Sequence, residues 1–180
     1  MKTHVLAACT LLAGCGYFDS DTIERLTNVS PLEADPGQYE VVVTLPEGLD
    51  IPRGGAVLNV TAQRPDTHAS SSGRYVLQRR ETTEGALLFR VAPGDLPQLK
   101  AQQALIRDWE AETGGATTGT FGVDVDACRK GDGPDLNGLM SISLIEGTGT
   151  APRVLVPPTP VRQVVITGGD NQVILPPCGL

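Results

Sequence analysis

The chain has 180 residues, of which 40% are hydrophobic but only 4% aromatic, and its formal net charge is −7. This length fits one domain with a tether, and the acidic balance argues against nucleic acid and against an electrostatic contact with anionic lipid, which both require basic surfaces. The 21 Gly and 14 Pro indicate many turns and few long helices, so the core must consist mainly of aliphatic side chains.

The first fifteen residues have the layout of an export signal. Lys2 precedes an apolar run at residues 5–13, which is too short to span a bilayer, since that takes about 20 residues. A short basic stretch followed by a short apolar run is typical of a secretory signal peptide. The run ends in Leu-Ala-Gly-Cys at residues 12–15. This layout predicts a secretory signal peptide.

The tetrapeptide at residues 12–15 resembles the lipobox of bacterial lipoproteins. In that family the cysteine thiol receives a diacylglycerol and the chain is then cut before the cysteine. The resemblance therefore implies a signal peptide at residues 1–14, cleavage before Cys15 and lipidation of Cys15. Two or three acyl chains would attach the protein firmly to a membrane. In enteric bacteria an Asp after the cysteine favours the inner membrane. Gly16 follows here, so the resemblance implies the outer membrane, with the domain facing the periplasm. The alternatives are an ordinary signal peptide with an incidental cysteine, or a buried N-terminal element.

Residues 16–37 are polar and acidic and end in Asp-Pro-Gly. We predict that residues 15–37 form the lipidated N-terminus and a flexible tether, and that residues 38–180 form a single β-rich domain.

The first half of that domain alternates apolar and polar residues with the period of a strand. Strands are predicted at residues 39–45, 57–63, 74–80 and 86–91, with a polar loop at 66–73 and a turn at 82–85.

One segment has helical periodicity instead. Leu99, Ile106 and Trp109 recur at helical spacing, and Asp95 with Gln98 resembles a capping box. We predict one helix at about residues 96–112, with its apolar stripe in the core.

Strands resume at residues 120–127 and 139–145, followed by shorter apolar runs at 153–156, 161–166 and 173–175. The residues between the first two of these runs, 157–160, contain three prolines. The predicted fold is mainly β, a β-sandwich-like antiparallel domain of about seven to nine short strands with one helix.

Two cysteines remain once Cys9 is removed with the signal and Cys15 carries lipid. An even pair in an exported chain predicts a disulfide between Cys128 and Cys178. It would close a loop of about 50 residues and stabilise the fold by roughly 4 kcal/mol in the chain-entropy model. The alternative is two free thiols.

Candidate chemistry is sparse. His68 is the one histidine beyond the signal, and with Asp66 it lies in a serine-rich stretch that makes a poor platform for a catalytic triad. A lone histidine also argues against zinc. We predict no catalytic residue, metal or cofactor.

Acidic residues cluster at positions 124–137, where Asp124, Asp126, Asp132, Asp135 and Asn137 lie. A calcium loop of the EF-hand type fails in both registers. The fifth position from Asp124 is a cysteine, and the third from Asp132 is a proline. A weak surface calcium site and a solvated acidic loop are the two interpretations that remain.

These observations favour a membrane-anchored, non-catalytic structural or protein-interaction module that binds another envelope protein or polymer. Two other functions stay open. A periplasmic hydrolase would need converging polar groups, and a carrier of small apolar ligands would need a deep pocket.

Overall fold

The structure is a computed structural model that describes residues 32–81, 86–145, 147, 151–164 and 175–179. As predicted, it is mainly β and antiparallel. The elements in chain order are η1 (Pro36–Gln38), β1 (Glu40–Thr44), β2 (Leu49–Asp50), β3 (Ala56–Arg64), β4 (Ala69–Glu81), β5 (Leu87–Val91), α2 (Leu96–Glu112), β6 (Thr118–Val125), β7 (Cys128–Arg129), β8 (Leu139–Ile145), β9 (Arg153–Pro160) and α3 (Val161–Val164).

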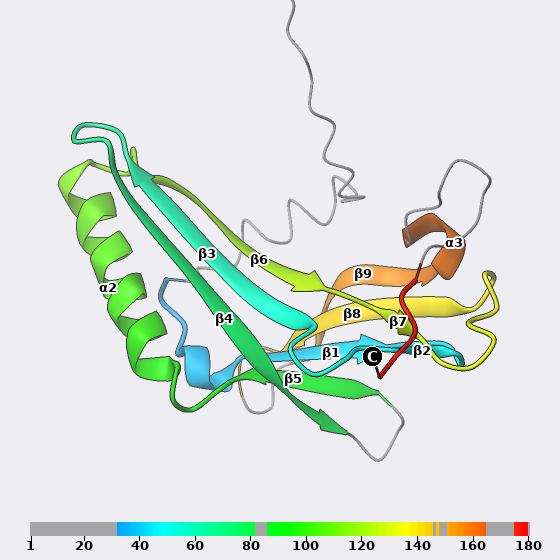
Figure 1. Ribbon diagram of the computed structural model, residues 1–180. Coiled ribbons are helices and arrows are strands. Elements are labelled where there is room, and N and C mark those ends of the chain that lie inside the picture. The colour runs from blue at the N-terminus through cyan, green and yellow to red at the C-terminus, as the bar shows by residue number, and fades with distance from the viewer. Residues whose placement is uncertain (1–31, 82–85, 146, 148–150, 165–174, 180) are drawn as a thin grey trace, which may run out of the picture.

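Seven strands form one sheet in the order β6-β3-β4-β5-β1-β8-β9, and β2 with β7 forms a small second sheet (Figure 1). The large sheet curls around a common core. The rings of Tyr39, just before β1, and Phe121 on β6 lie 5.7 Å apart between centroids, although three strands separate β1 from β6 in the sheet. The inward side chains of the two halves therefore share one core, in a sandwich-like arrangement.

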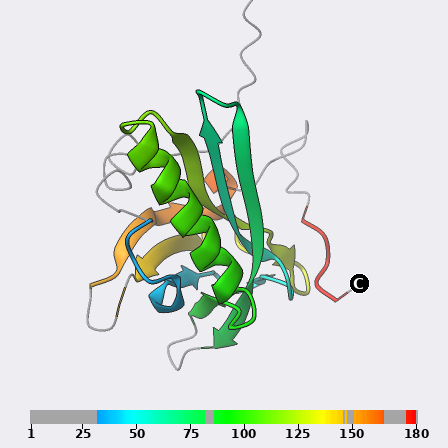
Figure 2. The ribbon, with the colours of Figure 1, turned by 90° about the vertical axis from the view of Figure 1, so that its left-hand side faces the viewer.

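Strand β4 belongs to both halves of the curled sheet. Residues 69–76 pair with β3, and residues 77–81 pair with β5. The polar loop predicted at residues 66–73 is therefore wrong for residues 69–73, which are part of the strand. Their composition resembles a loop because inward positions here carry Ser71 and Gly73, and these small residues leave room for α2, which lies beside β3 and β4 (Figure 2).

Gln102 of α2 fills that room. Its side-chain amide donates to the Val60 carbonyl oxygen at 3.2 Å and to Ser71 Oγ at 3.0 Å, and its Oε1 accepts from the Tyr75 hydroxyl at 2.8 Å. Burial, and secondarily the charge of Asp95, raises the pKa of Tyr75, which keeps this hydroxyl protonated as a donor. A fully bonded amide thus fixes the helix on the sheet.

The C-terminal part of the sheet differs from the prediction. The sequence predicts a short run that ends at residue 156, but strand β9 continues through the prolines at 157, 158 and 160. Proline lacks an N–H group, but Pro157 and Pro158 lie in the register shift between the pairs Met140–Thr159 and Ile142–Val156, and sheets accept proline at such irregularities and on edge strands. Val161–Val164 forms a four-residue helix rather than the start of a strand, with Val161 fully buried. The remainder of that predicted strand, like residues 173–174, lies outside the described residues.

The small sheet holds the end of the described chain. Cys128 of β7 is disulfide-bonded to Cys178 with their Cα atoms 5.0 Å apart, which agrees with the sequence prediction. Arg129 N donates to the Pro176 carbonyl oxygen, and Cys178 N donates to the Arg129 carbonyl oxygen, each at 2.9 Å. The tail therefore runs beside β7 like a further strand.

Asp50 of β2 connects the small sheet to the large one. Its carboxylate accepts from Arg79 of β4 at 2.6 Å, from Lys130 at 2.8 Å and from the backbone N–H of Ile51 at 2.8 Å. Burial by itself would raise the pKa of Asp50, but the Lys130 and Ile51 hydrogen bonds and the two cations together lower it below the ordinary value of 3.8.

Residues 32–37, which the sequence predicts as the end of the tether, pack against α2. Arg107 donates to the Leu32 carbonyl oxygen, Gln103 donates to the Ala34 carbonyl oxygen at 3.3 Å, and Lys100 pairs with Asp35 at 3.0 Å. The packed chain thus includes residues before Gln38. The rest of the predicted tether lies outside the described residues.

Candidate functional site: the edge of strand β6

Apart from the bonded pair Cys128 and Cys178, the described residues that the sequence singles out do not converge. Cys15 lies outside the described residues. His68 is exposed in the tight turn between β3 and β4, at φ 56°, and nearby Asp66 is bonded to Arg64 with Nε and Oδ1 2.7 Å apart. Neither a serine nor Asp66 is hydrogen-bonded to His68 in the described chain. The turn therefore assembles no triad.

The acidic residues between positions 124 and 137 do not form a cluster either, because Asp124 and Asp135 each accept a hydrogen bond from a different neighbour. Asp124 Oδ2 accepts from Asn59 of β3 at 2.6 Å, and Asp135 Oδ1 accepts from the backbone N–H of Asn137 at 2.9 Å. Within the described residues, no group of three or more His, Cys, Asp or Glu side chains is placed to hold a metal ion.

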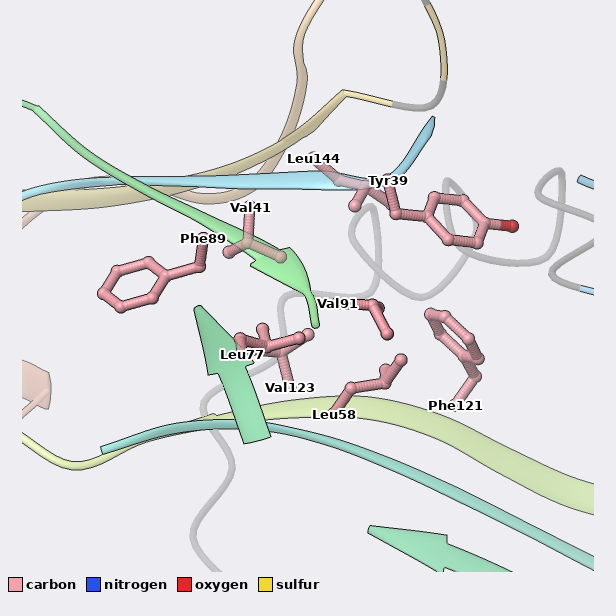
Figure 3. Close-up of a pocket in the computed structure, with 9 residues that line it drawn as sticks. All are labelled: Tyr39, Val41, Leu58, Leu77, Phe89, Val91, Phe121, Val123 and Leu144. Carbon is pink, nitrogen blue, oxygen red and sulfur yellow. The ribbon is translucent and has the colours of Figure 1, made fainter. Parts of the chain in front are cut away.

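The core between the two halves of the sheet is filled. Figure 3 shows nine side chains, all apolar except for the hydroxyl of Tyr39, that surround a cavity of only about 10 Å³. That volume is about enough for one water molecule, whereas pockets for small ligands measure roughly 300–1,000 Å³. This cavity has no room for the small apolar ligand that a carrier would bind.

The two edges of the large sheet, β6 and β9, differ in their protection. Natural sheets protect their edges with charged side chains, especially lysine, and with proline, bulges or covering segments. Strand β9 has three prolines among its eight residues, and its pairing with β8 contains register shifts. Strand β6, with the sequence Thr-Gly-Thr-Phe-Gly-Val-Asp-Val, has neither proline nor lysine. The β6 edge is therefore the one suited to pairing with another strand.

The orientation of the β6 backbone follows from one hydrogen bond. Asp126 N donates to the Gly55 carbonyl oxygen at 2.7 Å, in register with the β3–β6 ladder. In an antiparallel ladder such bonded positions recur at every second residue, so the even-numbered residues of β6 bond to β3. The odd-numbered residues point their N–H and C=O groups away from the sheet. No described residue bonds to these outward groups, which belong to Gly119, Phe121, Val123 and Val125.

The same odd-numbered positions face the core with their side chains. Phe121 and Val123 pack against it but stay partly exposed, while Val60 and Leu58, which pair with them on β3, are each only 3% exposed. The described residues thus cover the core less well along β6 than along its inner neighbour.

The outer face of the β6-β3-β4 half is polar. A shallow hollow of about 420 Å³ lies over it, and within the hollow the Thr61 and Thr120 hydroxyl oxygens are 2.7 Å apart. The outward side chains lining it are uncharged: Thr61, Gln63, Ser70, Ser72, Thr118 and Thr120. The single charge on β6 is that of Asp124, which forms no ion pair with any described residue.

The described residues form a mainly β domain in which the β6 edge has neither proline nor lysine and pairs, on its outer side, with no other described strand. The chain matches no protein-family model, no curated protein and no solved structure. Among the residues that the structure describes, no helix has the length and apolar character needed to cross a membrane.

The local pattern at residues 120–127 predicts a strand correctly, but it does not say which strands lie at the edges of the sheet. One signal was present in the sequence: residues 118–125 lack proline and lysine, whereas residues 153–160 contain three prolines. This contrast gains meaning only once both segments are known to be edges.

Proposed function

We propose that this chain is a lipid-anchored envelope protein whose β domain acts without catalysis, by binding an extended segment of a partner protein at the edge of β6. The lipobox resemblance at residues 12–15 supports attachment through Cys15, at the outer membrane and facing the periplasm. The observation that carries the binding function is the contrast between the proline-rich edge at β9 and the unprotected edge at β6.

Binding would proceed by strand addition. The partner segment would pair its backbone with the outward N–H and C=O groups of β6, and every second side chain would cover the partly exposed Phe121 and Val123. The predicted tether would let the domain reach such a partner, since a flexible chain of about 16 residues has an end-to-end distance of roughly 20–25 Å.

Site-specific photo-crosslinking in intact cells tests this proposal. A photoreactive residue replaces Gly122 on β6, where an added Cβ meets no atom within 4 Å, or Val154 on β9 as the control. We expect position 122 to yield a joined peptide from one identified partner protein, and position 154 to yield none. Equal adducts at both positions, or none at position 122, would contradict the proposal.

A pair of substitutions separates the backbone from the side chain. Val123→Pro removes an outward N–H group that makes no bond to β3, whereas Val123→Ala shortens the side chain and keeps that N–H. Strand addition predicts that Val123→Pro abolishes the adduct at position 122 and that Val123→Ala retains most of it. Equal loss in both variants would indicate a side-chain contact instead.

A further inference from the structure

Resting on the function proposed above, we infer that the segment bound at β6 alternates apolar and polar residues and carries a basic residue opposite Asp124. The inference concerns the chemistry of the partner, which the two faces of β6 determine separately.

The inward face sets the apolar half of the alternation. Directly paired residues of an antiparallel ladder point to the same face of the sheet. A strand added beside β6 therefore places every second side chain next to Gly119, Phe121, Val123 or Val125, over the core. Phe121 and Val123 are partly exposed there, so apolar neighbours remove more apolar surface from water than polar ones do.

The outward face sets the polar half and its charge. Thr118 and Thr120 are neutral and exposed, and Asp124 is exposed with Asn59 as its hydrogen-bond donor and no cation beside it among the described residues. Asp126, which is also exposed, lies two residues further along the chain, and the whole chain carries a net charge of −7. An acidic residue opposite Asp124 would destabilise the pairing, whereas Lys or Arg would form a favourable cross-strand pair.

Synthetic peptides test the inference on the mature chain beginning at Cys15. Three labelled nine-residue peptides alternate Thr and Val and differ at one central polar position, which is Lys, Gln or Glu. N-methyl groups along one edge prevent self-association. A fourth peptide has the composition of the Lys peptide with its Val residues grouped together. Fluorescence anisotropy gives the dissociation constants, and amide hydrogen exchange at Phe121 and Val123 reports occupation of the edge.

We expect the Lys peptide to bind best and the Glu peptide about tenfold more weakly, with Gln between them. The peptide with grouped Val residues should leave the exchange of both amides unchanged. Asp124→Asn should remove most of the difference between Lys and Glu, and added salt should reduce it.

The opposite outcomes are distinguishable. If the Lys and Glu peptides bind equally and both slow exchange at Phe121 and Val123, strand addition stands, but the inference that the partner carries a basic residue opposite Asp124 is overturned. If no peptide slows exchange, the inference is overturned, and the crosslinking experiment decides the proposed function separately. The amides of Phe121 and Val123 could also exchange slowly in the mature chain without peptide. If they do so at every protein concentration, residues 16–31 of the same chain occupy the edge. If they do so only at high protein concentration, a second copy occupies it. Either result overturns the inference.

Discussion

The contact between α2 and the sheet should be very sensitive to one methyl group at Gly73. A Cβ added there would lie 2.4 Å from Gln102 Oε1 and 2.7 Å from both Cε2 and the hydroxyl oxygen of Tyr75. All three distances are well inside van der Waals contact. Gly73→Ala therefore requires Gln102 or Tyr75 to move, and either movement breaks the hydrogen bond that joins them.

The expected cost follows from three contributions. Overpacking a well-filled site costs about 1–3 kcal/mol, and a lost hydrogen bond costs about 1 kcal/mol. Replacing glycine by alanine in a strand returns about 0.5–1 kcal/mol. We therefore expect Gly73→Ala to lower the free energy of unfolding by about 1–3.5 kcal/mol.

Trp109 provides the assay. It is the only tryptophan of the chain, and it lies on α2, packed against the core. Urea titration of the chain beginning at Cys15, followed by tryptophan fluorescence, measures the free energy of unfolding. Gly122→Ala is the matched control, because it adds the same methyl in a strand where no atom lies within 4 Å. In a Gln102→Ala background, which removes the nearest atom, Gly73→Ala should cost at least about 1 kcal/mol less.

Equal urea midpoints for Gly73→Ala and Gly122→Ala would refute this reasoning. So would a cost for Gly73→Ala that is unchanged by Gln102→Ala, because the penalty would then arise from the strand and not from the contact with α2.

Three further predictions concern other parts of the chain. Replacing both Cys128 and Cys178 by serine should cost up to about 4 kcal/mol and speed amide exchange in residues 175–179. Free reaction of both native thiols with maleimide would contradict the bridge. Because the pKa of Asp50 is lowered in the folded state, its carboxylate stabilises the fold above pH 3.8 and loses that effect as the pH falls further. As the pH falls from about 5 to about 2, the free energy of unfolding should therefore decrease more for the native chain than for Asp50→Asn. Urea midpoints that fall equally with pH in the two chains would count against this. Finally, Cys15→Ser should abolish labelling by a palmitate analogue and membrane association while leaving the urea midpoint unchanged, and persistent labelling would show that another residue carries the lipid.

The elements that the sequence predicted well are those whose periodicity reflects a single environment. Helix α2 has the bounds expected from its apolar spacing, and β1, β3, β5 and β8 lie within about two residues of their predictions. Even there, the N-terminus of α2 differs from the prediction. The Asp95 side chain makes no capping hydrogen bond, and Leu99 N bonds to the Asp95 carbonyl oxygen, so the predicted capping box is absent.

The sequence-based predictions are wrong where contacts with other parts of the fold determine which residue types a segment contains. Ser71 and Gly73 resemble a loop because α2 needs space above them. Pro157 and Pro158 resemble a break because the sequence does not show that β9 lies at an edge. The candidate site could not be predicted for the same reason. Whether the backbone N–H and C=O groups of Phe121 point away from the sheet depends on the strand order and on the register. Neither is a local property of the sequence.

The strand order also has a consequence for the time at which the sheet can be completed. Val43 of β1 pairs with Ile142 of β8, about 100 residues later in the chain. During synthesis from the N-terminus, β1 acquires β5 on one side long before β8 arrives on the other. Domains dominated by such distant pairings fold slowly. For that interval Val43, which is fully buried in the finished sheet, and its inward neighbours form an apolar surface that still lacks its β8 side.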